Sequence, residues 1–187
     1  MASLHQAIAD ILPTRLEFYE NWLNSSGLRE GTIGVAQFFA VLSFLRQEGP
    51  AYGLIMARAG EYAAVWTTEA LPEFERSLIL ALPRALRLRA ALWLARRLVR
   101  QAYSQSRALT RTRRGAGSVD VRGSLFCTVR ENTTEPLCGF YAAAVSRFLS
   151  LLKVAAEAHV TDCRATGAAN CLVSVTAAGS HRSAVAA

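Results

Sequence analysis

Three cysteines in the second half of the chain have the residue type and spacing of metal ligands. Cys138 is followed by 24 residues and then Cys163, and seven further residues lead to Cys171. Gly167 lies between the last two cysteines, where it would allow the chain to bend. Three thiolates with one further ligand make a common zinc site. The alternative is that these cysteines are small buried hydrophobic residues, as free cysteines commonly are.

The sequence lacks the motifs of common enzymes. Its three histidines, His5, His159 and His181, do not stand beside a serine or cysteine nucleophile signature, and carboxylates are sparse after residue 75. Gly115 and Gly117 belong to no phosphate-binding motif and favour a hairpin turn. We therefore expect neither catalytic residues nor a nucleotide cofactor.

Length and composition favour one globular domain in the cytoplasm. The chain has 187 residues, of which 52% are hydrophobic and 19% are charged, which excludes a disordered protein. Four cysteines in such a chain favour free thiols or metal ligands over a disulfide framework. The most apolar stretch, Leu78–Leu98, contains five arginines, so no transmembrane segment is expected. Residues 1–10 lack the basic start of a signal peptide.

Charge is unevenly distributed along the chain. Residues 1–75 have a net charge of −5, residues 76–130 have a net charge of +12, and residues 131–187 are neutral. A basic stretch of this kind favours nucleic acid, anionic lipid or an acidic ligand as a partner. The alternatives are a codon bias toward arginine and packing of the two halves against each other. Because residues 84–114 carry no docking motif for nucleic acid, nucleic acid is not expected as a partner.

Apolar spacing predicts helices in the first 104 residues and strands after them. The predicted helices cover residues 4–23 (interrupted at Pro13), 33–46 (capped by Thr32), 51–68 and 72–104 (kinked at Pro83). Alternation predicts strands over residues 108–114, 119–129, 155–161 and 171–175, with a turn at 115–118 and a helix over 138–154. We therefore expect an α+β domain with a helical part (1–106), a strand-rich part containing the cysteines (107–176) and a flexible tail (177–187).

The strand-rich part resembles a known family. Gly123-Ser124-Leu125-Phe126, the cysteine at a helix start, and the pattern Cys163-x3-Gly167-x3-Cys171 are similar to the 4-vinyl-reductase-like domain. This is a hydrocarbon-binding family related in fold to TRAPP vesicle-tethering subunits, and the resemblance covers roughly residues 107–176. The helix that starts at Cys138 is most similar to members from bacteriochlorophyll biosynthesis.

The resemblance implies helices packed on a small antiparallel sheet, a homodimer formed through helices, and a pocket for an aromatic or tetrapyrrole-like ligand. In sensor members of the family, three cysteines and a glutamate bind zinc, and the glutamate stands three residues before the second cysteine. This chain has Val160 at that position. His159 would share a strand face with Cys163, so the expected ligands are the three cysteines with His159 or a water.

Aromatic and arginine side chains are the candidates for ligand binding. The candidates are Phe38, Phe39, Trp66, Trp93, Phe126, Phe140 and Tyr141, with Arg96 and Arg100 for ligand carboxylates. Alternatively, the aromatic residues fill the core and the arginines form a solvated face. The sequence favours a non-catalytic carrier or sensor of a small hydrophobic ligand. The family resemblance implies that this role belongs to bacteriochlorophyll biosynthesis. The alternative is a TRAPP-like scaffold that presents its arginines to a protein partner or an anionic membrane.

Overall fold

The computed structural model describes residues 2–23, 34–102, 105–113, 115–128 and 133–177. Helices make up the first half of the described chain: α1 (Ala2–Ile11), the 3₁₀ turn η1 (Pro13–Arg15), α2 (Leu16–Leu23), α4 (Val35–Gln47), α5 (Pro50–Glu69), α6 (Glu73–Ala81) and α7 (Arg84–Ala102). The second half contains β1 (Arg107–Arg113), β2 (Ala116–Arg122), α8 (Gly139–Leu151), β3 (Ala156–Asp162), the 3₁₀ turn η2 (Arg164–Thr166) and β4 (Cys171–Ala177). This arrangement confirms the predicted α+β fold class.

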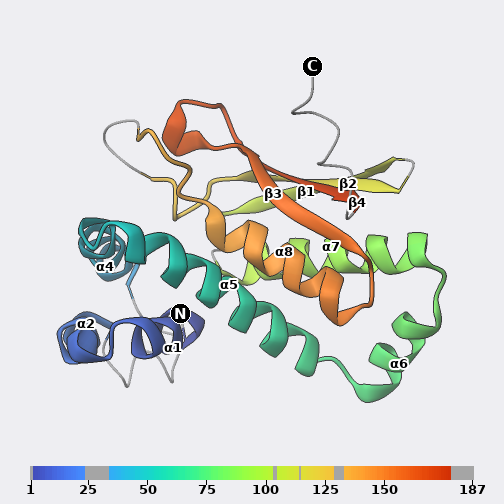
Figure 1. The fold of residues 1–187 in the computed structure, drawn as a ribbon, viewed down its shortest axis with the longest axis horizontal. Helices are drawn as coiled ribbons and strands as arrows, with labels where there is room; N and C mark the ends of the chain where they lie inside the picture. The colour runs from blue at the N-terminus through green and yellow to red at the C-terminus, as the bar shows by residue number, and fades with distance from the viewer. Residues whose placement is uncertain (1, 24–33, 103–104, 114, 129–132, 178–187) are drawn as a thin grey trace.

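The four strands form an antiparallel sheet in the order β1-β2-β4-β3. Val119 pairs with Val173, and these two side chains are buried on the face that α7 and α8 cover. On its other side α8 packs against α5, and α1 packs against α5 in turn (Figure 1). The fold is therefore a sheet, a layer containing α7 and α8, and further helices beneath that layer.

Several predicted boundaries are confirmed, and one strand is corrected. Helix breaks occur at Pro13 and Pro83, as proline requires, because it lacks a backbone donor. The predicted second strand is too long: β2 ends at Arg122 because Gly123 has φ +66° and the chain turns there. Gly34 caps α4 and its N–H donates to Gln37 Oε1 at 3.1 Å, whereas the predicted cap, Thr32, lies outside the described residues.

Helices α5 and α8 cross unusually close to each other at Gly60. A Cβ atom built on Gly60 would lie 2.2 Å from the backbone oxygen of Phe140 and 3.0 Å from the backbone nitrogen of Ala144. These are backbone atoms of α8, so no side chain can rotate away to make room. Glycine at this position thus fixes the distance between α5 and the first turn of α8, which follows Cys138.

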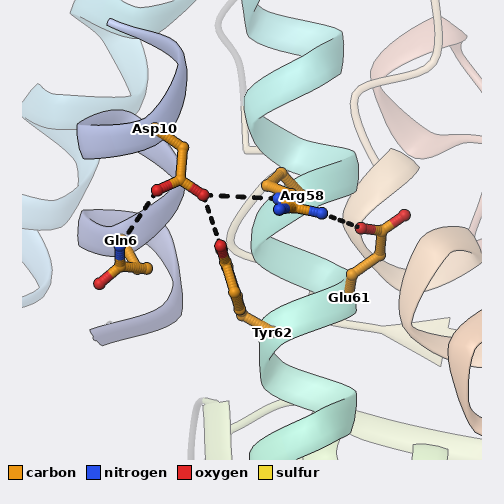
Figure 2. A network of polar contacts seen from close by, with 5 residues as sticks. All are labelled: Gln6, Asp10, Arg58, Glu61 and Tyr62. Carbon is orange, nitrogen blue, oxygen red and sulfur yellow. Dashed lines mark hydrogen bonds and ion pairs between the residues drawn. The ribbon is translucent and has the colours of Figure 1, made fainter. Parts of the chain in front are cut away.

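A polar network on the surface attaches α1 to α5 (Figure 2). Tyr62 on α5 donates a hydrogen bond to Asp10 on α1, and Gln6 donates to the other carboxylate oxygen at 3.1 Å. The Arg58 Nε atom lies 3.5 Å from Asp10, and its Nη1 atom pairs with Glu61 at 3.1 Å. The hydrogen bonds from Tyr62 and Gln6, aided by Arg58, hold the pKa of Asp10 below its ordinary value of 3.8.

This network predicts an acid-dependent contribution to stability. Because the folded-state pKa of Asp10 is lowered, its carboxylate stabilises the fold above about pH 4, and this contribution is lost as the pH falls through the folded-state pKa. We expect Asp10→Asn to lower the thermal midpoint at pH 7 and to have a smaller effect at pH 3. Thermal unfolding of both proteins across this range measures the difference, and a difference that stays constant with pH would contradict the assignment.

Candidate functional site

Four cysteines from separate elements of the strand-rich part converge at one buried point. Cys127 lies in the turn after β2, Cys138 caps the N-terminus of α8, Cys163 follows β3, and Cys171 begins β4. Each side chain is at most 2% exposed, and none of the four cysteines forms a disulfide. The structure therefore brings together the three cysteines predicted from spacing and adds Cys127 to them.

The geometry of this cysteine cluster fits a tetrahedral metal ion. All four Sγ atoms lie within 4.8 Å of one another; the Cys127 and Cys163 sulfurs are 3.5 Å apart, and those of Cys127 and Cys171 are 3.3 Å apart. A zinc ion with Zn–S bonds of about 2.3 Å would separate its sulfur ligands by about 3.8 Å. Four cysteine thiolates are a common ligand set of structural zinc sites, which leave no open position on the ion.

Contacts among the buried thiols shift their pKa values in opposite directions. Contacts with the thiols of Cys127 and Cys138, together with the backbone N–H of Arg164, lower the pKa of Cys171 despite its burial. The neighbouring thiols and burial raise the pKa of Cys138. For Cys127, contact with Cys138 lowers the pKa, but contact with Cys171 and burial outweigh it and raise the pKa. A bound dication would stabilise negative charge on every sulfur, so all four cysteines could be thiolates at the same time.

Backbone groups around the cluster orient the sulfurs and favour their charge. The N–H of Arg164 donates to Cys171 Sγ at 3.4 Å, which is the kind of outer contact that steadies a metal ligand. Gly167 closes the intervening loop in the left-handed conformation, with φ 96°, and its N–H donates to Arg164 O. The N-terminus of α8 adds the positive end of a helix dipole beside Cys138.

His159 does not lie with the cysteines. It pairs across strands with Ser174, whereas the buried inner face of β4 carries Cys171, Val173 and Val175. Because side chains alternate along a strand, His159 belongs to the outer face of the sheet. The expected sharing of a face by His159 and Cys163 fails because β3 is irregular between Val160 and Asp162, before Cys163. Cys127 occupies the fourth position instead.

The predicted ligand-binding residues do not form one pocket. Phe126 packs against Phe38, Phe140 and Tyr141 with ring centroids 4.6–5.8 Å apart, so these four residues fill the core next to the cysteine cluster. Phe39 is half-buried on α4. The remaining four side chains are exposed, one on α5 and three on α7: Trp66, Trp93, Arg96 and Arg100.

A cavity of about 550 Å³ lies between α7 and one end of the sheet. Its walls combine the first turns of α7 with the hairpin between β1 and β2 and with the end of β4, and they are mostly apolar. The lining residues are Arg84, Ala85, Leu88, Gly115, Ala116, Thr176 and Ala177. Small side chains leave the space open, and the size is that of a pocket for a small organic ligand. We call it the α7–sheet cavity.

Comparison with known proteins identifies the fold. No family model and no curated protein matches the chain. In the described part, no helix has the length and apolar character needed to cross a membrane. Among solved structures, the crystal structure of the phenol-responsive sensory domain of the transcription activator PoxR with phenol is similar, with a TM-score of 0.54 and 13% identity. The match covers 76% of this chain and 73% of that chain, so the two share a fold.

Proposed function

We propose that this protein is a binding domain for a small hydrophobic molecule and acts as a sensor or carrier. The observation that carries the proposal is the mostly apolar α7–sheet cavity, in a fold shared with a phenol-responsive sensory domain. Apolar walls with few polar groups suit an aromatic ligand, which would bind chiefly by leaving water. Arg84, which is charged and lines the cavity, donates from Nη2 to Ala155 O at 2.7 Å, which holds its side chain across the gap between α7 and β3.

In this proposal the cysteine cluster holds one Zn²⁺ ion, with Cys127, Cys138, Cys163 and Cys171 as ligands. The ion would supply structural cross-linking rather than catalysis, because four protein ligands leave no position for a substrate. The cluster links the end of β2, the start of α8, the end of β3 and the start of β4. A bound ion would therefore hold the sheet and the start of α8 in a fixed relative position.

Filling the α7–sheet cavity tests the ligand proposal. Ala85 is exposed and lines the cavity, so Ala85→Trp should occupy part of the space without disturbing the core. We expect phenol and larger aromatic compounds to bind the unmodified protein, and Ala85→Trp to weaken binding at least about 10-fold. Isothermal titration measures the affinity, and intact folding is checked by thermal unfolding.

Ala36→Trp provides the matched control. Ala36 is exposed on α4, and it does not line the α7–sheet cavity. This variant should bind the probes like the unmodified protein. If Ala85→Trp and Ala36→Trp bind them equally well, the ligand does not enter the α7–sheet cavity. If no aromatic probe binds the unmodified protein, the binding function itself is wrong.

The resemblance to the 4-vinyl-reductase-like family supports a finer proposal. A tetrapyrrole from bacteriochlorophyll biosynthesis belongs among the probes, because the helix after Cys138 resembles those family members. A homodimer through helices is also part of this proposal, and Phe18 and Trp22 leave an exposed aromatic surface on α2 that a second copy would cover. Sedimentation of the purified protein measures the subunit number.

The exposed face of α7 favours a second candidate function, a scaffold that docks on an anionic membrane. Leu86 and Trp93 are 39% and 46% exposed there, and Arg97 lies over the Trp93 ring at 5.9 Å. Three exposed arginines, Arg89, Arg96 and Arg100, share this face, and α7 has no acidic residue. Tryptophan and leucine among arginines suit the headgroup region of a bilayer. Binding to anionic vesicles that weakens steeply with salt would favour this function.

A further inference from the structure

A second cavity has a half-buried cation in its wall, and no described residue forms an ion pair with that cation. The cavity has a volume of about 480 Å³ and lies between the start of α5 and the segment that leads into α8. Its walls are formed by Arg46, Gly49, Pro50, Tyr52, Gly53, Thr133, Glu135, Pro136 and Leu137. We call it the Arg46 cavity.

Arg46 uses only some of its donors within the described residues. The Nη2 atom donates to the backbone oxygen of Phe126 at 3.0 Å, and the guanidinium also lies beside the Tyr52 hydroxyl. Nε is buried and has no hydrogen-bond partner. A guanidinium carries five N–H donors, four of them on its two Nη atoms, and the hydrogen bond from Nη2 to Phe126 uses one of these four. The Nη atoms are therefore the donors that an acceptor in the cavity would meet.

No carboxylate of the described residues forms an ion pair with Arg46. Glu48, two residues along, accepts hydrogen bonds from Arg15 at 2.9 Å and from Tyr19 at 3.0 Å. Glu135 belongs to the cavity wall but is exposed to solvent. The half-buried guanidinium of Arg46 favours binding of an anionic ligand. Solvent and salt would screen the attraction between the two charges less here than at the protein surface. The N-terminus of the 20-residue helix α5 adds a positive dipole end to the same cavity.

The remaining walls are apolar or small. Pro50, Pro136 and Leu137 offer carbon surface, and a Cβ atom added at Gly53 would meet nothing within 4 Å. We propose that the Arg46 cavity binds a small carboxylic acid with an apolar body, whose carboxylate pairs with Arg46 and whose body lies along the two prolines. Arginine recognises a planar carboxylate with two parallel hydrogen bonds, which gives this ligand class an advantage over neutral compounds of the same shape.

The position of the cavity also links it to the cysteine cluster. Arg46 donates to the carbonyl of Phe126, which precedes Cys127, and Tyr52 donates to the carbonyl of Leu137 at 3.3 Å, which precedes Cys138. Arg46 and Tyr52 therefore line the cavity and also hydrogen-bond to the residues that precede two of the cysteines in the sequence. For this reason each variant below is also assayed for bound zinc and for its unfolding midpoint.

The test compares benzoate with its neutral analogue benzamide, using the full chain and isothermal titration. We expect benzoate to bind at least about 10-fold more tightly than benzamide. Arg46→Gln should weaken benzoate binding at least about 10-fold, whereas Arg89→Gln on the exposed face of α7 should leave it unchanged. Equal affinity for the two compounds, or undetectable binding of benzoate, would overturn the proposal.

A second variant separates loss of the site from loss of the fold. Gly53→Phe fills the Arg46 cavity while leaving Arg46 and its hydrogen bond to Phe126 in place, so it should abolish benzoate binding without lowering the unfolding midpoint. Unchanged benzoate binding in Gly53→Phe would place the ligand elsewhere. Ala85→Trp should leave benzoate binding intact, so failure of this site and failure of the α7–sheet cavity can be distinguished.

Discussion

Replacing Cys127 by serine is expected to abolish the proposed zinc binding, although Cys127 stands outside the spacing pattern that first indicates a metal site. If the four sulfurs hold the ion together, the loss of one leaves three thiolates and a weaker hydroxyl ligand in a buried site. Changes to outer-shell partners alone cost 10–100-fold in metal affinity, so the loss of a ligand should cost at least about 100-fold. Competition with a chromophoric chelator measures the affinity.

His159→Gln is the matched control for Cys127→Ser. A site built from three cysteines and His159 predicts the reverse ranking, with zinc lost from His159→Gln and retained by Cys127→Ser. The outer-face position of His159 predicts that its replacement leaves zinc affinity unchanged. Retention of full affinity by Cys127→Ser would show that Cys127 is a buried hydrophobic residue and not a ligand.

Gly60→Ala is expected to be the most destabilising substitution of a single methyl group in the helical part. The added Cβ atom would meet backbone atoms of α8 at 2.2 Å and 3.0 Å, so α5 and α8 would have to separate. Overpacking of this kind costs about 1–3 kcal/mol, and it exceeds the gain of about 1 kcal/mol that alanine brings to a helix interior. Urea unfolding of the zinc-loaded protein measures the change.

The same helix provides the control for Gly60→Ala. Gly53 is exposed and has open space around the position of its missing Cβ atom. Gly53→Ala should therefore stabilise the protein by roughly 0.5–1 kcal/mol through helix propensity alone. If both substitutions stabilise the protein, the close crossing of α5 and α8 is absent in solution.

Helices were predictable because their signals are local. The apolar face of the helix after Pro83 is predicted from its spacing, and Leu88, Leu92 and Val99 are buried as expected. The end of β2 was not predicted, because apolar residues continue through Leu125 and Phe126 beyond the turn at Gly123. Those residues are buried by the aromatic core rather than by strand pairing, and burial alone does not distinguish the two.

The fourth member of the cysteine cluster was missed for the same reason. Treating residues 119–129 as one strand places Cys127 within a regular element and not in a turn at which ligands gather. The pair Gly123-Ser124 was the available signal that the strand ends early. Neither cavity could be predicted, since each depends on empty space between elements distant in the chain, such as α5 and the segment before α8.

Native mass spectrometry of the protein purified without chelators, before and after denaturation, tests the central claim most directly. We predict one zinc ion per chain and an additional small organic mass that denaturation releases; the same spectrum gives the subunit number. A particle that carries neither zinc nor any organic molecule, and that still binds no aromatic probe, would contradict the account. Such a result would favour the scaffold that presents the arginines of α7 to a membrane.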